Sequence, residues 1–274
     1  MTKVLILSSF VAASRVGGRA QAEALVRLGI EPMLVPTVLY GRHPGLGAPG
    51  GAAVAAETMA SILDGIKAQG VFEQTDAAIF GYFATPDQVA VAVKTLQAIR
   101  RANPDARLIV DPILGDHDVG LYVPPDVQHA VTETLVPLAE IVIPNAWELG
   151  AITGIEVKDG KSAAAAARKL GRPVLVSSVP AEEDHIGVVY ADDEGAWIAH
   201  HTKASIAPRG AGDLLTVFYA AAVVQGCAPR DALELAAAVT ADAVAYAHGA
   251  SEFLLSSLPR ELQPSFRIVF EAVE

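Results

Sequence analysis

The chain has 274 residues, 52% of them hydrophobic, and a formal net charge of −11 at pH 7. This length permits a substantial core in one large domain or two small ones. The acidic balance argues against nucleic acid or an anionic membrane as a partner, although local donors and a metal can still bind an anionic nucleotide. The single cysteine, Cys227, excludes an internal disulfide and a thiolate metal cluster. Because no apolar run has the length of a signal sequence or membrane span, we expect a cytoplasmic protein.

Short apolar runs alternate with longer segments rich in Ala and Leu. The short runs predict buried strands at residues 4–7, 33–36, 77–80, 108–110, 141–143 and 174–177. The longer segments predict helices at residues 18–28, 53–69, 86–102, 125–138, 146–152 and 162–170. This alternation predicts an α/β fold with right-handed βαβ units and a mainly parallel central sheet that has helices on both faces.

The C-terminal part of the chain has a different pattern. Residues 186–191 and 196–202 predict a β-hairpin, and residues 211–225 and 229–248 predict two long helices. Residues 41–51 are dense in Gly and Pro and predict a mobile loop over a site. No repeat or linker interrupts the chain, so we expect residues 1–274 to form a single domain.

Polar residues follow most of the predicted strands. Ligands of an open parallel sheet bind beyond the carboxyl ends of its strands, so these residues are expected to share one edge of the sheet. They are Ser8, Ser9, Thr37, Gly81, Tyr82, Asp111, Asn145, Glu148, Ser177 and Ser178.

The most informative motif is Gly210-Ala211-Gly212-Asp213, directly before an apolar helical stretch. Glycines let a ligand approach the backbone, and the free N–H groups at a helix start attract anions. Asp213 would then stand beside a phosphoryl site and take a proton from an attacking hydroxyl. The alternative is that the glycines only make a turn and Asp213 only caps the helix.

Two further motifs have carboxylates at strand ends. Asp111, followed by Pro112, is positioned to hold Mg²⁺, and the alternative is a turn-forming Asp-Pro pair. Asn145 and Glu148 have the spacing of a capping box, which is compatible with a second role in organising metal-bound water. The chain has no dinucleotide fingerprint, no P-loop and no set of histidines with the spacing of a metal site.

Taken in order, these stretches resemble the ribokinase-like superfamily and, within it, the pyridoxal kinases. The similarity at the expected phosphoryl site lies in Gly210-Ala211-Gly212-Asp213. The similarity after a predicted strand lies in Asp111-Pro112-Ile113-Leu114-Gly115-Asp116, followed by Gly120-Leu121-Tyr122-Val123. Further similarity lies in Pro36-Thr37-Val38-Leu39-Tyr40, Phe80-Gly81-Tyr82 and Ile143-Pro144-Asn145 through Glu148-Leu149. The similarity covers nearly the whole chain, from Leu5 to about Ala247.

The resemblance implies an ATP-dependent kinase that phosphorylates the 5′-hydroxymethyl group of pyridoxal, pyridoxine or pyridoxamine. It assigns proton removal to Asp213, phosphoryl binding to Gly210, Ala211 and Gly212, and Mg²⁺ to Asp111 and Glu148. It places the nucleotide near Asn145, Ser177 and Ser178, and the acceptor near Ser9, Val16, Thr37 and Tyr82. It further implies a homodimer and leaves a need for K⁺ open.

The sequence departs from the pyridoxal kinase pattern at several positions. Phe10 replaces the usual His, Ile143 and Ala211 replace Thr, and residues 12–15 lack the usual aromatic and His groups. These differences leave two alternatives open. One is a kinase of another small alcohol, such as hydroxymethylpyrimidine, a sugar or a nucleoside, and the other is a binding protein without turnover.

Overall fold

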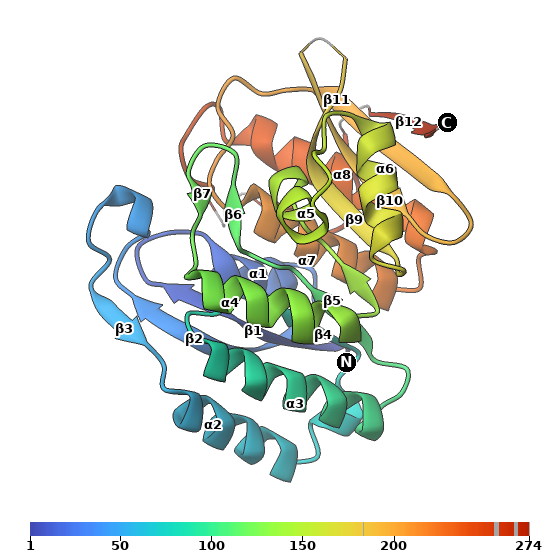
Figure 1. Ribbon diagram of the computed structural model, residues 1–274. Coiled ribbons are helices and arrows are strands. Elements are labelled where there is room, and N and C mark those ends of the chain that lie inside the picture. Colours follow the sequence, from blue (N-terminus) through green and yellow to red (C-terminus); the bar gives the residue numbers. More distant parts are fainter. Residues whose placement is uncertain (183, 255–257, 266–267, 274) are drawn as a thin grey trace.

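The computed structural model of the protein describes residues 1–182, 184–254, 258–265 and 268–273. Within these residues, ten strands form one sheet in the order β12-β11-β10-β9-β8-β5-β4-β1-β2-β3 (Figure 1). Its six central strands are parallel: β1 Lys3–Val11, β2 Glu31–Tyr40, β4 Ala77–Phe80, β5 Arg107–Val110, β8 Ile141–Val142 and β9 Val174–Pro180. The α/β fold with a mainly parallel sheet is therefore confirmed.

Antiparallel strands complete both edges of the sheet. They are β3 Gly51–Ala53, β10 His185–Ala191, β11 Ala196–Thr202 and β12 Val269–Ala272. The predicted hairpin is thus β10 and β11, which extend the main sheet. A small separate sheet pairs β6 Gly115–Asp116 with β7 Gly120–Leu121.

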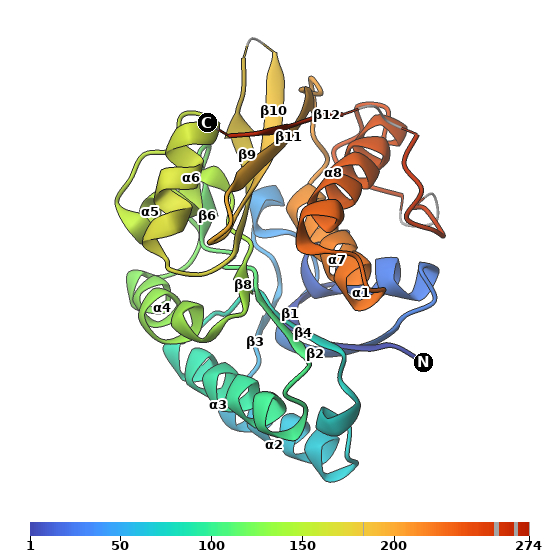
Figure 2. The same ribbon diagram turned by 90° about the vertical axis from the view of Figure 1, so that its right-hand side faces the viewer.

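Helices cover both faces of the sheet (Figure 2). One face packs against α1 Gly17–Arg27, α7 Ala211–Val224 and α8 Pro229–Tyr246. The other packs against α2 Ala56–Ala68, α3 Pro86–Ala102, α4 Pro125–Ala130, α5 Ala146–Thr153 and α6 Gly160–Lys169. Short turns are η1 Pro44–Leu46, η2 Phe72–Gln74, the π-helical η3 Val131–Leu135 and η4 Val136–Leu138. The predicted helix at 125–138 is therefore helical throughout but changes its winding after α4.

The strand order reverses direction at β1. The chain leaves β1 for β2 on one side, then crosses to β4 on the other, and from there it continues to β5, β8 and β9. Such a switch point leaves a crevice at the carboxyl ends of the strands, because the connections on either side diverge. This crevice is where the polar strand-end residues lie.

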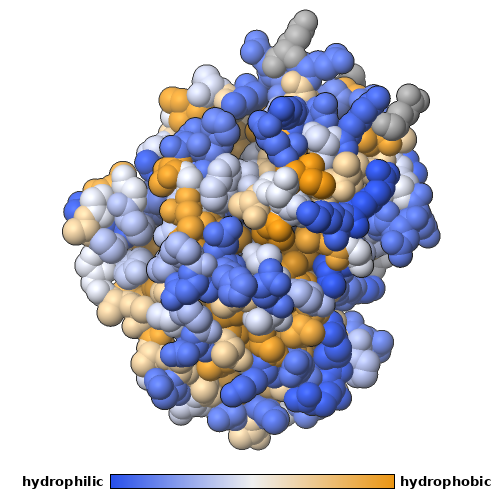
Figure 3. Space-filling view, viewed as in Figure 1, coloured by the Kyte–Doolittle hydropathy of each residue, from blue (hydrophilic) through white to orange (hydrophobic). Residues whose placement is uncertain are grey.

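Hydrophilic and apolar side chains both reach the outer surface (Figure 3). On the face in Figure 3, hydrophilic side chains predominate, and apolar ones show between them. In the described part of the chain, no helix is both long and apolar enough to cross a membrane.

Candidate active site

Asp213 lies in the first turn of α7, directly at the carboxyl edge of the sheet. Its Oδ2 atom accepts a hydrogen bond of 2.8 Å from the N–H of Gly17, at the start of α1. Its Oδ1 atom is buried and has no hydrogen-bond partner among the described residues. Burial raises the pKa of Asp213 to about 6, and the hydrogen bond from Gly17 opposes this shift. One oxygen is therefore fixed, while the other is available to accept a proton.

The backbone at the start of α7 presents N–H groups without acceptors. Within the described residues, those of Gly210, Ala211 and Gly212 have no hydrogen-bond partner, and the first bond of the turn runs from the Leu214 N–H to the Gly210 carbonyl at 3.0 Å. Gly210 has a φ of +90°, and a Cβ atom there would lie 2.5 Å from the Arg15 carbonyl. A Cβ on Gly212 would meet nothing within 4 Å. These donors and the positive end of the helix dipole suit a phosphoryl group in this open space.

Asp111 follows β5 and faces the same turn of α7. Its Oδ2 atom accepts a hydrogen bond of 2.7 Å from the Thr216 hydroxyl, which lies three residues after Asp213 on one face of the helix. Burial raises the pKa of Asp111 well above its usual range, and the charges of Asp213 and Glu148 raise it further, while Thr216 lowers it. The three carboxylates therefore share one electrostatic environment.

Glu148 and Asn145 form the predicted capping box at the start of α5. The Asn145 Oδ1 atom accepts from the Glu148 N–H at 2.8 Å, and Glu148 Oε2 accepts from the Asn145 N–H at 2.8 Å. Glu148 Oε1 also accepts from the N–H groups of Leu114 at 2.8 Å and Gly115 at 3.2 Å. Burial is the main cause that raises the pKa of Glu148 to about 8, and these backbone bonds oppose it. Glu148 thus ties α5 to the loop after β5.

The chemistry of this donor set fits a hydrated Mg²⁺. Carboxylate oxygens are hard ligands, and Mg²⁺ in nucleotide enzymes commonly keeps several waters and uses one or two carboxylates plus phosphate oxygens. The described residues contain no group of three side chains that would enclose a metal directly. Burial and, after it, repulsion from Asp213 and Glu148 raise the pKa of Asp111, so a cation beside Asp111 would stabilise its ionised form.

Ser9 lies at the end of β1, close to Asp213. The pairing of β1 with β2 loses its regular register between Ser8 and Phe10, so Ser9 occupies a bulge, a feature common beside active sites. Its hydroxyl lies against Gly17, where any side chain would collide with it. Ser9 and Gly17, near the N-terminus, are therefore neighbours of Asp213, which belongs to the C-terminal half of the chain.

The other predicted acceptor residues lie around this point. Val16 is buried and immediately precedes α1. The Thr37 hydroxyl donates to the Tyr82 carbonyl at 2.7 Å, so it joins β2 to the segment that follows β4. The Tyr82 ring is half-buried, and burial and nearby Tyr40 raise its pKa. Thr37 and Tyr82 are therefore neighbours, and Val16 adjoins Gly17, which lies against Ser9.

The predicted nucleotide residues lie at the other end, where Asn145 follows β8 and Ser177 and Ser178 belong to β9. The Ser177 N–H donates to the Pro144 carbonyl at 2.9 Å, and Ser177 pairs with Asn145 in an isolated bridge. Ser178 is exposed and has a φ of +58°, an unusual value for a residue with a side chain. The side-chain amide of Asn145 donates to the Gly115 carbonyl at 2.8 Å, so this residue is held by the fold.

The Gly- and Pro-rich loop at 41–51 packs beside the segment that follows β1. The Ala13 N–H donates to the Gly41 carbonyl at 2.9 Å, and the His43 N–H donates to the Ser14 hydroxyl at 3.3 Å. The loop contains η1 and runs directly into β3. It therefore lies next to the acceptor end of the crevice.

Two residues of the site were missed by the sequence interpretation. Thr216 bonds Asp111, and Gly17 bonds Asp213. The signal for Thr216 was a hydroxyl three residues after Asp213 within an otherwise apolar run. The signal for Gly17 was only its place at a helix start, which gave no indication of its partner.

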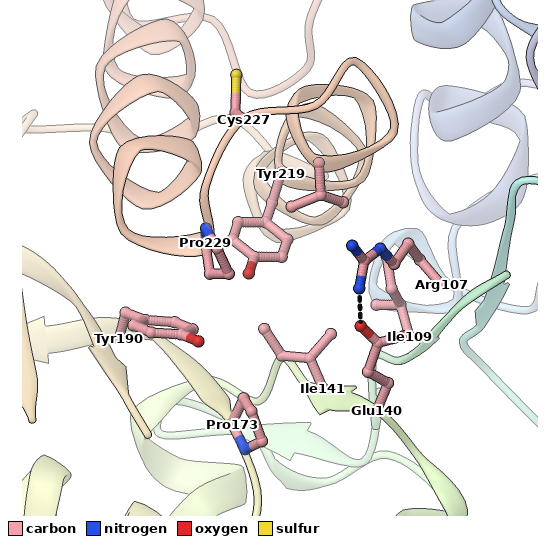
Figure 4. Close-up of a pocket in the computed structure, with 10 residues that line it drawn as sticks. Arg107, Ile109, Glu140, Ile141, Pro173, Tyr190, Tyr219, Cys227 and Pro229 are labelled. Atoms are coloured by element: carbon pink, nitrogen blue, oxygen red, sulfur yellow. Dashed lines mark hydrogen bonds and ion pairs between the residues drawn. The ribbon is translucent and has the colours of Figure 1, made fainter. Parts of the chain in front are cut away.

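A cavity of about 70 Å³ lies at the opposite edge of the sheet and is distinct from this site. Figure 4 shows the Tyr190 and Tyr219 hydroxyls turned toward it, with an ion pair between Arg107 and Glu140 on one side. That pair has an N···O distance of 2.6 Å. Arg107 opens β5, whereas Asp111 follows its end, so the strand separates the cavity from the carboxylates.

The chain resembles known kinases in sequence. The family model described as phosphomethylpyrimidine kinase matches residues 52–253. The chain is 32% identical over 248 residues to "Pyridoxal kinase PdxY" of Corynebacterium diphtheriae, covering 88% of each chain. It is 34% identical over 242 residues to "Pyridoxal kinase PdxY" of Rubrobacter xylanophilus, covering 85% of this chain and 83% of the relative.

The fold is also similar to that of solved pyridoxal kinase structures. A crystal structure of pyridoxal kinase from Entamoeba histolytica matches with a TM-score of 0.90 and 25% identity, over 99% of this chain and all of the other. Pyridoxal kinase from Leishmania donovani in complex with ADP and pyridoxamine matches with a TM-score of 0.91 and 24% identity over the full length of both chains.

Proposed function

This chain belongs to the phosphomethylpyrimidine kinase family and, within the ribokinase-like superfamily, to the pyridoxal kinases, and from that premise we propose that it transfers a phosphoryl group from ATP to the 5′-hydroxymethyl group of a B6 vitamer. The observation that carries the proposal is the Asp213 carboxylate. Its unpartnered Oδ1 stands at the start of a helix whose first N–H groups are also unpartnered among the described residues. A base beside an anion site is the arrangement that phosphoryl transfer to an alcohol requires.

Asp213 acts as the general base in this proposal. Its Oδ1 accepts the proton of the attacking hydroxymethyl group, while the Gly17 N–H holds Oδ2 and fixes the orientation of the carboxylate. The alkoxide oxygen then attacks the γ-phosphorus, the bond from phosphorus to the β–γ bridging oxygen breaks, and ADP leaves. Because burial raises the pKa of Asp213 to about 6, the carboxylate is a stronger base than an exposed one and is still mainly ionised at pH 7.

The N–H groups of Gly210, Ala211 and Gly212 bind the phosphoryl oxygens as charge develops on them. Donors that are already oriented need no rearrangement at the moment of reaction, so they stabilise the transition state. Asp111 would hold Mg²⁺, which supplies neutralisation of phosphate charge, and Glu148 would act on it through water. Asn145, Ser177 and Ser178 contact the nucleotide phosphates.

The acceptor occupies the end of the crevice near β1. Ser9 donates to or accepts from the pyridine ring, Val16 gives an apolar contact, and Tyr82 covers the ring. Thr37 lines the same end in this scheme, and its hydroxyl also positions the Tyr82 backbone.

Replacing Asp213 with Asn tests the proposal. Asn keeps an oxygen for the Gly17 N–H but removes the base, so kcat should fall by about 10²- to 10⁴-fold. The affinity for ATP, measured by calorimetry, should remain unchanged. The assay couples ADP release to oxidation of NADH, with pyridoxal, pyridoxine and pyridoxamine as acceptors.

Asp231→Asn is the matched control, because Asp231 also lies in the first turn of a helix, α8, on the same face of the sheet. It should keep full turnover. Near-normal turnover in Asp213→Asn would remove Asp213 from the mechanism.

Hydroxymethylpyrimidine is the second candidate acceptor, because the matching family model is that of phosphomethylpyrimidine kinases. Adding it to the same panel separates the two substrates by their kcat/KM values. A protein that binds a vitamer without turnover would give heat of binding in calorimetry but no ADP in the coupled assay.

The proposal extends to the whole protein. We take residues 1–274 as one domain, since a single sheet draws strands from β1 to β12. The resemblance to pyridoxal kinases further supports a cytoplasmic homodimer, and a K⁺ requirement is tested by replacing K⁺ with Na⁺ in the assay.

A further inference from the structure

The chain that follows α8 lies beside residues 209–212, which carry the proposed phosphoryl site and are called the phosphoryl segment below. The Arg209 N–H donates to the Ser251 carbonyl at 3.0 Å, and Arg209 pairs with Glu252 in an isolated parallel bridge. The next residue, Phe253, is buried in the core that includes α7 and α8. The backbone at Glu252 is therefore held by a hydrogen bond and by the core, directly beside the phosphoryl segment.

The Glu252 side chain binds the chain on the opposite wall of the site. Its Oε2 atom lies 3.3 Å from Nη1 of Arg15, in the short segment between β1 and α1. At 17% exposure, Glu252 is the most buried carboxylate among the ion pairs of the described residues. Burial protects this pair from the screening by water and salt that weakens ion pairs on the surface.

The backbone after Arg15 contacts both parts of the proposed catalytic machinery. A Cβ atom on Gly210 would lie 2.5 Å from the Arg15 carbonyl oxygen and 3.5 Å from the Cα atom of Val16, so the two segments approach closely. Two residues after Arg15, the Gly17 N–H donates to Oδ2 of Asp213 at 2.8 Å. The segment that Glu252 binds is therefore the one that orients the proposed base.

We propose that Glu252 is a positioning residue for phosphoryl transfer, because it holds Arg15 against the phosphoryl segment and thereby fixes the Gly17 N–H that orients Asp213. The inference rests on the proposed kinase function and adds to it a residue from the C-terminal end of the chain. Turnover depends steeply on such geometry, since a misplacement of about 1 Å can cost roughly 100-fold in rate. A single ion pair can therefore matter more for turnover than for stability.

A double-mutant cycle in kcat tests this route. Glu252→Ala should lower kcat about tenfold, because the Asp213 carboxylate is less well oriented, while the KM for ATP changes little. Arg15→Ala should give a similar loss, and the double variant should be no slower than either single variant, since all three break the same route. Glu23→Ala is the matched control, because Glu23 also pairs with an arginine, Arg19 at 2.9 Å, but within α1. It should keep full turnover.

Full turnover in Glu252→Ala would overturn the inference, as would losses that multiply to about a hundredfold in the double variant. A change in the KM for ATP alone would also overturn it. Arg15→Ala decides the case in which Glu252→Ala does not fold, because it breaks the same ion pair from the other side.

Amide hydrogen exchange, followed by NMR, makes the test independent of turnover. The Gly17 amide should exchange faster in Glu252→Ala than in the unmodified protein, because its bond to Asp213 opens more often, and Glu23→Ala should leave it unchanged. If the unmodified protein turns over no acceptor, the kinase proposal fails. Faster exchange of Gly17 in Glu252→Ala then still supports the coupling, and unchanged exchange rejects it.

Discussion

Asp213 and Thr216 project from one face of α7 toward the carboxyl edge of the sheet. Asp213 is held from outside the helix by Gly17, whereas Thr216 holds a carboxylate that belongs to β5. The helix therefore carries both the proposed base and the hydroxyl that keeps Asp111 more acidic than burial alone would allow. Loss of the Gly17 contact should therefore affect the use of the alcohol, whereas loss of the Thr216 contact should affect the use of the nucleotide with its Mg²⁺.

Replacing Thr216 with Val should weaken the use of Mg²⁺. The change removes the hydrogen bond that lowers the pKa of Asp111, so more of this carboxyl group is protonated at a given pH. The Mg²⁺ concentration for half-maximal activity should rise several-fold at pH 6.5 and less at pH 8.5, since high pH ionises Asp111 again. Thr153→Val is the control, because Thr153 is also a buried helical residue, bonded to the Leu149 carbonyl. Equal Mg²⁺ dependence in both variants would contradict this role.

Among single residues, the sequence predicted those that have both a reactive side chain and a distinctive local sequence. Asp213 follows two glycines, and Asp111 follows a strand, so each could be identified without knowledge of its neighbours. Their partners could not, because Gly17 and Asp213 are brought together only by packing of α1 against α7. Long-range contacts of this kind leave no periodic signal in a single sequence.

The start of α5 combines a capping box with the fixation of a neighbouring loop. Glu148 accepts three backbone hydrogen bonds, from Leu114, Gly115 and Asn145. An ordinary capping box satisfies only its own helix. This element therefore sets the position of the loop after Asp111.

Replacing Glu148 with Ala should cost about 3 kcal/mol of unfolding free energy, because buried N–H groups lose their acceptor. The control is Asp159→Ala in the exposed capping box of α6, for which about 1 kcal/mol is expected. Urea denaturation measures both. Equal losses would mean that the bonds to Leu114 and Gly115 add nothing to an ordinary cap.

The elements that the sequence interpretation missed are short or depend on remote pairing. β3 consists of Gly51, Ala52 and Ala53, which have low strand propensity, and it forms by pairing with β2. It also shortens the predicted helix at 53–69, because α2 begins only at Ala56. β12 pairs with β11 although α7 and α8 separate the two strands in the sequence. β6 and β7 have only two residues each. Long periodic helices such as α3 were predicted within their observed bounds.

The whole molecule has large apolar side chains on its surface, including Leu39, Leu46 and Val119. Such residues are common singly on soluble proteins and do not by themselves identify an interface. The proposed homodimer rests on the resemblance to pyridoxal kinases. Light scattering after size-exclusion chromatography should therefore give twice the chain mass of 28.5 kDa, unchanged on tenfold dilution. A mass of one chain at every concentration would contradict it.

The bond between Gly17 and Asp213 has a consequence for synthesis on the ribosome. An emerging chain that ends before α7 possesses the residues that we propose to line the vitamer site, but it lacks both the proposed base and the N–H groups at the start of α7. A ligand cannot stabilise such a nascent intermediate at the complete site, so residues 1–210, about three quarters of the chain, gain no stability from substrate until α7 has been made.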